Sequence, residues 1–450
     1  MDKNLRSLFG TDGIRGIANK DLTPELAFKV GKAVSKFLIS EGKKGKILIG
    51  KDSRPSGDFL EASLSAGILS SGSDVYRAGI LSTPAVALLT KIYNMDGGIV
   101  ISASHNPLED NGIKIFKTGG EKLSDEQERL IEEYISDDGM SNSDIPVGLE
   151  VGRFKTLDDP EEAYIKDITK GFSFNLNKLK IAVDCANGAT SIVVPRVLSM
   201  YGAHLMSFNN DVESGLINKN CGSTHPEVLK QIVKKSDAEI GFSYDGDGDR
   251  VIGCDSMGRI LDGDVIMAFC AINMKNNGLL ENNSVVTTIM ANYGFEKAMA
   301  ENDIKVYKTK VGDRYVLEKM LETCSILGGE QSGHLIFRNF SHIGDGLIST
   351  LIFLKFLKET RAEINEVYDI IEHYPQLLKN LKVKDKNGIM NSSSLKQKVS
   401  EAEKKLSGNG KIVVRSSGTE SVVRVMVEAK THELALEIQD DICNFISQLD

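Results

Sequence analysis

Short apolar runs that end in small polar residues recur along the chain, and a segment compatible with a helix follows each of them. Examples are Lys46–Gly50, Lys180–Val183 and Ser284–Ile289. A strand, a polar turn and a helix together form a βα unit, and repeated units favour mostly parallel sheets with helices on both faces. Because ligands of such sheets bind beyond the carboxyl ends of the strands, the polar turns are the first places to look for chemistry.

The C-terminal part of the chain follows a different pattern. Two predicted strands, Lys411–Arg415 and Val422–Val427, flank a polar loop of six residues, and apolar periodicity predicts a helix over His432–Leu449. This combination is typical of a small α+β domain.

The length of the chain indicates several domains. A chain of 450 residues exceeds the usual limit of one hydrophobic core, and at roughly 100–200 residues per domain it predicts two to four domains. Turn-rich segments near residues 136–144, 249–262 and 373–375 are the candidate boundaries. We predict four domains, over residues 1–155, 156–256, 257–370 and 371–450.

Composition and charge exclude several classes of partner. The hydrophobic fraction of 41% and the charged fraction of 26% are typical of a globular protein. The net charge of -9 argues against general binding of nucleic acid, which requires a clustered basic surface. An anionic ligand must therefore meet a local basic pocket.

Cysteine usage and the apolar segments indicate the compartment. The six cysteines show no C-x-x-C spacing, which argues against a zinc site and a disulfide framework and favours a reducing environment. The N-terminus lacks the apolar stretch of a signal peptide, and the most apolar later segment, Leu347–Leu357, is too short to span a bilayer. We therefore expect a cytoplasmic protein with no membrane partner.

The segment Asp245-Gly-Asp-Gly-Asp-Arg250 places three carboxylates on alternate residues. These repel one another by roughly 4 kcal/mol per pair at about 4 Å and an effective dielectric near 20, so the segment should hold a cation. An extended backbone would send Asp245, Asp247 and Asp249 to one side, and their hard oxygens favour magnesium. The alternative is a solvated acidic turn. An EF-hand has little support, because Arg250 and Ser256 occupy the positions of its Gly and Glu.

A second segment offers a hydroxyl at the end of a predicted strand. The apolar run Gly97–Ile101 is a predicted buried strand that delivers Ser102 and Ser104 at its carboxyl end. Either serine could be the reactive one, and Lys114 could carry a proton, bind a phosphate or be an ordinary surface lysine. A hydroxyl together with a cation site suggests phosphoryl transfer. The G-x-S-x-G, P-loop and G-x-G-x-x-G motifs are absent, which argues against an esterase, an NTPase and a dehydrogenase.

Two glycine-containing segments suggest ligand-binding loops. The segment Gly328–His334 contains a carboxylate, an amide, a hydroxyl and an imidazole, which suit a ligand with many hydroxyl groups. These groups belong to Glu330, Gln331, Ser332 and His334. The segment Arg415–Glu420 contains a guanidinium, hydroxyls and a glycine N–H, which suit a phosphate. In each case the alternative is a turn that binds nothing.

In chain order, these loops resemble those of the α-D-phosphohexomutase superfamily. The matching loops are the phosphoserine loop 102–107, the metal loop 245–250, the sugar loop 329–334 and the phosphate loop 415–420. Within the superfamily the chain is most similar to the bacterial phosphoglucosamine mutases, on Phe9–Gly16, Leu22–Glu25, Asn220–Pro226 and Val311–Met320. Gln331 supports this branch, because phosphomannomutase and phosphoglucomutase relatives typically carry Met there. Ser421 is a departure, because Pro usually follows Glu420 in the family.

The resemblance implies a fold and a reaction. The fold would comprise three related α/β domains with mixed, mostly parallel sheets and a C-terminal α+β domain, around a central cleft. The enzyme would be an isomerase that interconverts glucosamine 6-phosphate and glucosamine 1-phosphate through a phosphoserine and glucosamine 1,6-bisphosphate, which serves as intermediate and activator. The product would feed the synthesis of UDP-N-acetylglucosamine and cell-wall precursors, and the family expectation is a homodimer.

The resemblance also assigns roles to individual residues. Ser104 would be phosphorylated and would complete the coordination of one Mg2+ held by Asp245, Asp247 and Asp249. The substrate-binding residues would be Glu330, Gln331, Ser332, Arg415, Ser417, Gly418, Thr419 and Arg250. The residues near the reacting centre would be Arg15, Lys114, Lys310 and His334. The alternatives that stay open are a phosphomannomutase or phosphoglucomutase, a phosphosugar phosphatase and a non-catalytic sensor.

Overall fold

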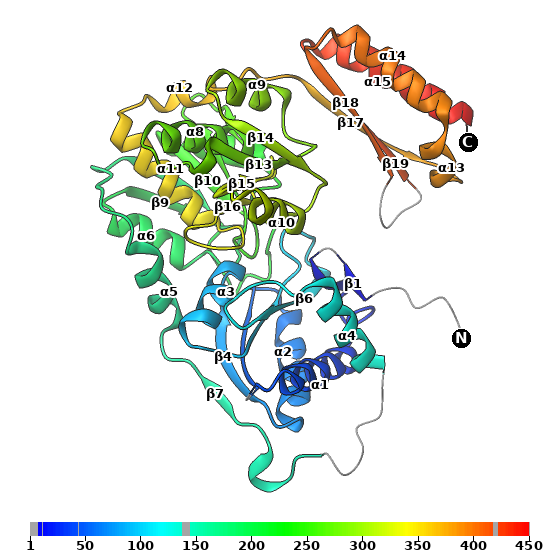
Figure 1. Cartoon of the computed structure of the whole chain (residues 1–450). Helices are drawn as coiled ribbons and strands as arrows, with labels where there is room; N and C mark the ends of the chain where they lie inside the picture. The colour runs from blue at the N-terminus through cyan, green and yellow to red at the C-terminus, as the bar shows by residue number, and fades with distance from the viewer. Residues whose placement is uncertain (1–7, 11, 44, 137–144, 417–421, 450) are drawn as a thin grey trace.

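Four sheets follow one another along the chain (Figure 1). The computed structural model describes residues 8–10, 12–43, 45–136, 145–416 and 422–449. Within these ranges the sheets contain seven, five, four and three strands. The first three sheets are mixed and have parallel strand pairs at their centres, whereas the fourth is wholly antiparallel. The predicted class of three α/β domains followed by an α+β domain is confirmed.

The first sheet has the strand order β1-β2-β6-β5-β3-β4-β7. Its strands are β1 (Phe9–Gly10), β2 (Gly13–Ile17), β3 (Lys46–Lys51), β4 (Asp74–Ile80), β5 (Gly97–Ile101), β6 (Asp110–Lys117) and β7 (Phe154–Thr156). Its helices are α1 (Pro24–Ser40), α2 (Ser56–Ser70), α3 (Thr83–Ile92) and α4 (Asp125–Ser136). In β3, Ile47 and Ile49 pack into one core with α1, α2 and α4, whereas Leu48 packs into another core with α3. Because successive side chains of a strand face opposite sides, the sheet is covered on both faces.

The second and third sheets repeat the strand-turn-helix pattern. The second contains β8 (Lys180–Asp184), β9 (His204–Phe208), β10 (Ile240–Tyr244), β11 (Val251–Asp255) and β12 (Ile260–Leu261), with α5 (Pro160–Thr169), α6 (Val193–Met200) and α7 (Pro226–Ser236). The third contains β13 (Ser284–Thr288), β14 (Lys305–Thr309), β15 (Leu327–Gly329) and β16 (Leu335–Phe337), with α8 (Gly263–Asn276), α9 (Tyr293–Glu301), α10 (Asp313–Thr323), α11 (Gly346–Thr360) and α12 (Ile364–Tyr368). Short 3-10 turns lie at Gly148–Glu150 and Glu281–Asn283. The three predicted strand-turn-helix units are confirmed as β3–α2, β8–α6 and β13–α9.

One hydrophobic core joins the first three sheets. It runs from Leu48 in β3 to Ile371 and includes almost the whole length of α11, which is buried against both the second and the third sheet. The apolar run Leu347–Leu357 is therefore a core helix. Among the helices in the described ranges, none is both long and apolar enough to cross a membrane.

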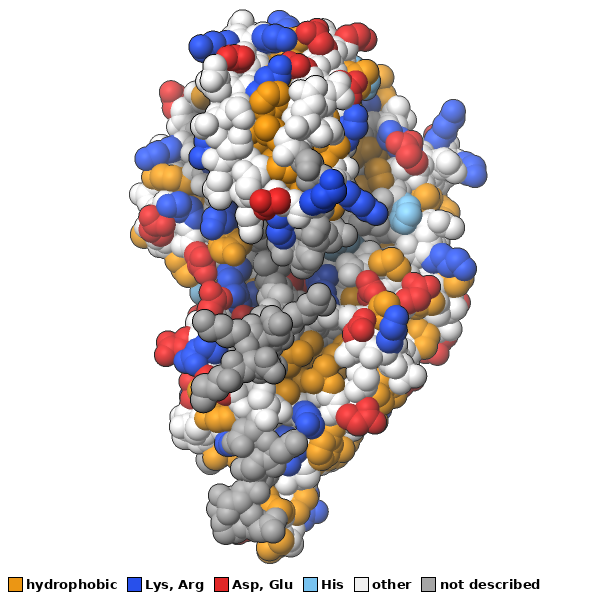
Figure 2. Space-filling model, turned by 90° about the vertical axis from the view of Figure 1, so that its right-hand side faces the viewer, with side chains coloured by type: hydrophobic (Ala, Val, Ile, Leu, Met, Phe, Trp, Pro, Cys, Tyr) orange, Lys and Arg blue, Asp and Glu red, His pale blue; other side chains and the backbone are white. Residues whose placement is uncertain are grey.

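The C-terminal unit has a core of its own. Its strands, β17 (Gln376–Lys382), β18 (Gly410–Ser416) and β19 (Val422–Ala429), pack against α13 (Lys386–Asn391), α14 (Ser393–Leu406) and α15 (His432–Leu449). The predicted strand pair and the predicted C-terminal helix are both confirmed. Figure 1 shows this unit standing out from the other three. Figure 2 shows a surface hollowed across its middle, between this unit above and the first sheet with its helices below, where a cleft was expected.

Candidate active site

The structure brings the predicted serine loop and the predicted acidic loop together. Strand β5 ends at Ile101, and the loop that follows carries Ser104, whose side chain is buried. The Ser104 hydroxyl donates a hydrogen bond of 2.5 Å to Oδ2 of Asp245, which lies 141 residues further along the chain. The contact joins the carboxyl end of a strand of the first sheet to the loop between β10 and β11 of the second.

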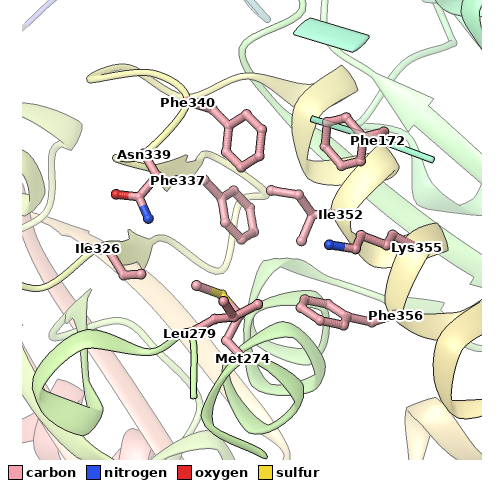
Figure 3. Close-up of a pocket in the computed structure, with 10 residues that line it drawn as sticks. All are labelled: Phe172, Met274, Leu279, Ile326, Phe337, Asn339, Phe340, Ile352, Lys355 and Phe356. Atoms are coloured by element: carbon pink, nitrogen blue, oxygen red, sulfur yellow. The ribbon is translucent and has the colours of Figure 1, made fainter. Parts of the chain in front are cut away.

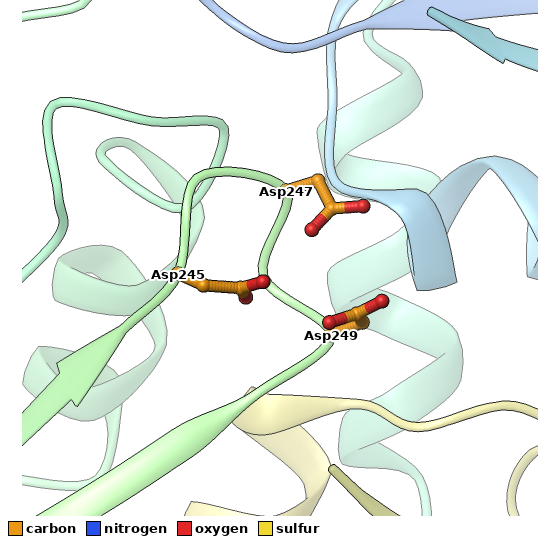
Figure 4. Close-up of side chains that lie close together, drawn as sticks. All are labelled: Asp245, Asp247 and Asp249. Carbon is orange, nitrogen blue, oxygen red and sulfur yellow. The ribbon is translucent and has the colours of Figure 1, made fainter. Parts of the chain in front are cut away.

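Asp245, Asp247 and Asp249 form the aspartate cluster (Figure 4). Each of these buried residues offers one carboxylate oxygen, and the three oxygens lie within 4.8 Å of one another. The predicted convergence is correct, but the predicted extended backbone is wrong. The loop is a tight turn in which Gly248 has a φ of 76°, and this turn carries the carboxylates to one point.

The aspartate cluster fits a cation. Oδ1 of Asp247 and Oδ1 of Asp249 are buried, and neither has a hydrogen-bond partner among the described residues. Burial, with repulsion from Asp249 and Asp247, raises the pKa of Asp245 well above its ordinary value. Buried acceptors without donors and mutual repulsion both favour the binding of a positive charge, and hard carboxylate oxygens suit a divalent ion such as magnesium.

Lys114 supplies one positive charge beside the cluster. Its ammonium lies 2.8 Å from Oδ2 of Asp247, 3.5 Å from Oδ2 of Asp249 and 2.9 Å from Oδ2 of Asp12. Burial by itself would lower the pKa of Lys114, but these three carboxylates outweigh burial and raise it well above the ordinary value. Lys114 is therefore a fixed cation at neutral pH.

His334 approaches the cluster from the third sheet. Its Nδ1 lies 3.7 Å from Oδ1 of Asp249, and its Nε2 lies 3.6 Å from Oδ2 of Asp313. Burial lowers the pKa of His334, whereas Asp249, Asp313 and Glu330 together raise it, and the net direction is upward. His334 thus links the third sheet to the metal loop of the second.

Two arginines complete the group around Ser104. Arg15 donates to the carbonyl of Ala103 at 3.4 Å and to Oδ1 of Asn106 at 3.3 Å, so its guanidinium lies against the serine loop. Nε of Arg250 lies 3.8 Å from Oδ1 of Asp249. In both arginines Nε is buried without a hydrogen-bond partner in the described part of the chain. These unused donors are suited to an anion.

Other predicted site residues lie outside this group. Lys310 is exposed, with its ammonium 5.8 Å from the ring centre of Tyr315, and the described contacts do not bring it to Ser104. Glu330 is partly buried and its Oε1 accepts a hydrogen bond of 2.9 Å from the N–H of Gly312. Gln331 is partly buried and Ser332 is exposed, on the turn between β15 and β16. These positions leave the side chains of Glu330, Gln331 and Ser332 at the edge of the site, whereas His334 of the same loop reaches the aspartate cluster.

Only part of the predicted phosphate loop can be placed. Arg415 lies in β18, directly opposite Arg424 of β19. Burial, followed by the charge of Arg424, lowers the pKa of Arg415. Like charges directly opposite each other on paired strands are destabilising. Ser417, Gly418 and Thr419 lie outside the described residues.

The apolar pocket of about 260 Å³ in Figure 3 is separate from this chemistry. Its walls are mostly aromatic and aliphatic side chains, including Phe172, Phe337 and Phe356. None of its lining residues belongs to the group around Ser104. The candidate active site is the polar cluster and not this pocket.

Comparison with known proteins identifies the family. The models of the phosphoglucomutase/phosphomannomutase family match this chain with alpha/beta/alpha domain I over residues 6–141, domain II over 162–258, domain III over 262–374 and the C-terminal domain over 378–445. The phosphoglucosamine mutase of Desulforamulus reducens is 46% identical over 445 residues, which are 99% of this chain and 100% of that protein. This chain belongs to the phosphoglucosamine mutase family.

Further relatives agree with this assignment. The phosphoglucosamine mutase of Pelotomaculum thermopropionicum is 46% identical over 443 residues, which are 98% of this chain and 99% of that protein. The crystal structure of a phosphoglucomutase/phosphomannomutase family protein from Burkholderia thailandensis matches with a TM-score of 0.82 and 25% identity, over 98% of this chain and 97% of that one. Phosphoglucosamine mutases are isomerases of the metal-dependent phosphohexomutase superfamily, so the predicted family and enzyme class are confirmed.

Sequence reasoning missed several charged and polar neighbours of the site. Thr83, at the start of α3, donates a hydrogen bond of 2.6 Å to Oδ2 of Asp247. Lys122 forms ion pairs with Asp12 and with Asp313, and thereby connects the first sheet to the third. Asp12 and Asp313 lie within segments that resemble the phosphoglucosamine mutase family, which was the one signal available for them. The sequence contains no motif that points to Thr83 or Lys122, because their roles depend on partners far away in the chain.

Proposed function

We propose that this chain interconverts glucosamine 6-phosphate and glucosamine 1-phosphate, with Ser104 as the phosphoryl carrier. The observation that carries the proposal is the hydrogen bond of 2.5 Å between Ser104 and Asp245, within a cluster in which Oδ1 of Asp247 and Oδ1 of Asp249 are buried without a donor among the described residues. A serine hydroxyl beside an acidic cation site is the arrangement that a phosphoserine enzyme needs.

Ser104, Asp245, Asp247 and Asp249 would hold one Mg2+, which supplies stabilisation for the negative charge that develops on the transferred phosphoryl group. Lys114 adds a fixed positive charge beside Asp247. Arg15 and Arg250, each with an unused buried Nε donor, would hold phosphoryl oxygens. The protein contributes position and charge, because phosphoryl transfer asks for little covalent chemistry from it.

The proposed reaction has two transfers at one serine. In the first, the bond between phosphorus and Ser104 Oγ breaks and phosphorus bonds to the 1-hydroxyl oxygen of glucosamine 6-phosphate, whose proton ends on Ser104. The 1,6-bisphosphate then turns end for end. In the second transfer, the 6-phosphoryl group passes to Ser104 Oγ, the serine proton ends on the 6-hydroxyl, and glucosamine 1-phosphate leaves.

The other loops would hold the part of the substrate that is not reacting. Glu330, Gln331, Ser332 and His334 would bind the sugar, and Arg415, Ser417, Gly418 and Thr419 would bind the distal phosphate. The side chain of Lys310 is exposed and would contact the bound substrate. Because each orientation of the bisphosphate brings a phosphate to the C-terminal unit, this unit must accept either end, and hinge motion would allow it.

The chain would consist of four functional domains. Residues 1–155 would carry the phosphoserine loop, 156–256 the metal loop, 257–370 the sugar loop and 371–450 the phosphate loop. We propose that the enzyme acts as a homodimer and that its product feeds UDP-N-acetylglucosamine and cell-wall precursor synthesis. Gel filtration with light scattering tests the dimer.

Substrate preference provides the first prediction. With Mg2+ and a trace of the matching 1,6-bisphosphate, we expect kcat/KM for glucosamine 6-phosphate to exceed the values for glucose and mannose 6-phosphates by more than about tenfold, or roughly 1.4 kcal/mol. Gln331→Met should narrow that preference, because it replaces a hydrogen-bonding amide with a thioether. The variant should fold, because the Gln331 contact with Gly263 uses the backbone carbonyl, and the side chain that hydrogen-bonds Asp262 is only partly buried.

Two results would contradict this assignment. A higher kcat/KM for glucose or mannose 6-phosphate than for glucosamine 6-phosphate would identify a phosphoglucomutase or phosphomannomutase. Release of inorganic phosphate without isomerisation would identify a phosphosugar phosphatase, in which water takes the phosphoryl group from Ser104. A coupled assay for each sugar 1-phosphate, run beside a phosphate assay, separates these outcomes.

A further inference from the structure

Ser104 has a backbone conformation that a serine rarely adopts. Its φ is 53°, in the left-handed region, where the Cβ of a residue other than glycine is crowded. Glycine would relieve the crowding but would remove the hydroxyl. Such a conformation persists only where surrounding contacts enforce it. The question is therefore which side chains hold the loop in this shape.

Arg54 makes an unusual number of contacts with this loop. Its side chain is fully buried, and the residue lies in the turn between β3 and α2. Nη2 donates to the carbonyls of Ser104 at 3.0 Å and Asn106 at 2.8 Å. Nη1 donates to the carbonyl of Asp110 at 2.9 Å and also to that of Pro107. One rigid guanidinium thus donates hydrogen bonds to four carbonyls between residues 104 and 110.

Asp52 and Ser102 connect Arg54 to the backbone N–H of Ser104 through further hydrogen bonds. Nε of Arg54 donates to Oδ2 of Asp52 at 3.0 Å, and the Ser102 hydroxyl donates to the same oxygen at 2.6 Å. The Ser102 hydroxyl in turn accepts a hydrogen bond of 2.8 Å from the N–H of Ser104. Ser104 is thereby held by both its N–H and its carbonyl. We call the three residues that hold it, Asp52, Arg54 and Ser102, the loop clamp.

We propose that the loop clamp positions Ser104, by enforcing the left-handed backbone that points its hydroxyl at Asp245. This inference rests on the proposed function of Ser104. The hydrogen bonds of the three side chains form a closed set, since each ends on another member of the clamp or on the backbone of residues 104–110. The clamp thus acts through the loop, and Ser102 is a positioning hydroxyl.

Ser102→Ala is the main test, in the full-length chain. It removes one hydroxyl and leaves the Ser104 N–H and one oxygen of Asp52 without that partner. We expect kcat to fall by about 10–100-fold, as a small misplacement of a reacting group can produce, while KM for glucosamine 6-phosphate changes by less than about twofold. Intact-mass analysis should still detect one added phosphoryl group after incubation with the 1,6-bisphosphate.

Ser53→Ala is the matched control. Ser53 is also buried and lies in the same segment, but its hydroxyl donates to the carbonyl of Asn187 and not to the loop. It should keep kcat within about threefold of the unmodified enzyme. Arg54→Lys keeps the charge but cannot reach four carbonyls, so it should lose more activity than Ser102→Ala. In Arg54→Ala, added guanidinium should restore part of kcat.

A crystal structure of Ser102→Ala gives a readout that does not depend on turnover. We expect the φ of residue 104 to leave the left-handed region or the Oγ–Asp245 contact to lengthen. An unchanged loop together with an unchanged kcat would overturn the proposed role of the loop clamp. Loss of the phosphoprotein in Ser102→Ala would instead identify Ser102 as the phosphoryl carrier. An unmodified enzyme that isomerises none of the three sugar phosphates would defeat the proposed function itself, whatever the loop does.

Discussion

Ser104→Ala should abolish isomerisation, with kcat lower by at least about 10⁴-fold, and should abolish the phosphoprotein seen by intact mass. Alanine has no oxygen to carry the phosphoryl group, and no other described hydroxyl donates to Asp245. The rest of the loop should keep its shape, because Arg54 and Asn218 bind the backbone carbonyl of residue 104 and not its side chain. The effect is therefore chemical and not a consequence of unfolding.

The control for this prediction is Ser102→Ala, which removes a hydroxyl two residues away from the same loop. It should retain the phosphoprotein and part of the turnover. The melting temperatures of both variants should be recorded, so that loss of fold is separated from loss of chemistry. If Ser104→Ala kept both turnover and the added mass, Ser104 could not be the carrier.

Asp245→Asn should weaken Mg2+ binding by at least about 100-fold and lower kcat by at least about 10³-fold. The amide keeps the shape of the carboxylate but removes one of the three charges that the ion would neutralise. The metal-free variant should fold, because a neutral amide avoids both the burial of a charge and the repulsion from Asp249 and Asp247, which together raise the pKa of Asp245. Isothermal titration with Mg2+ and the rise in melting temperature on adding Mg2+ both measure the affinity for Mg2+. The isomerase assay measures kcat.

Asp303→Asn is the matched control for the loss of one carboxylate. The side chain of Asp303 is 94% exposed and lies outside the site, so its substitution should leave Mg2+ affinity and kcat unchanged. An Asp245→Asn enzyme that bound Mg2+ as tightly as the unmodified enzyme would show that the aspartate cluster is not the metal site. Full activity after exhaustive chelation, with no metal found by elemental analysis, would lead to the same conclusion.

The sequence by itself determined the elements and the chemistry that lie within a few residues of one another. The strands β3, β5, β8 and β13 follow from apolar runs that end in polar turns, and α15 follows from its 3.6-residue periodicity. The acidic loop and the serine loop were recognisable because each is contiguous. For the same reason, motif order along the chain was enough to predict the family.

Only the tertiary structure decided how these pieces meet. The hydrogen bond between Ser104 and Asp245 spans 141 residues, and it exists because the first and second sheets pack on one core. The same packing brings Thr83 to Asp247, and the packing of the first unit against the third brings Lys122 to Asp313; no local pattern predicts either contact. It also distinguishes the two serines, since Ser102 is turned to Asp52. Periodicity reports on neighbours in sequence, whereas a site built from several sheets depends on contacts that form only when the sheets pack together.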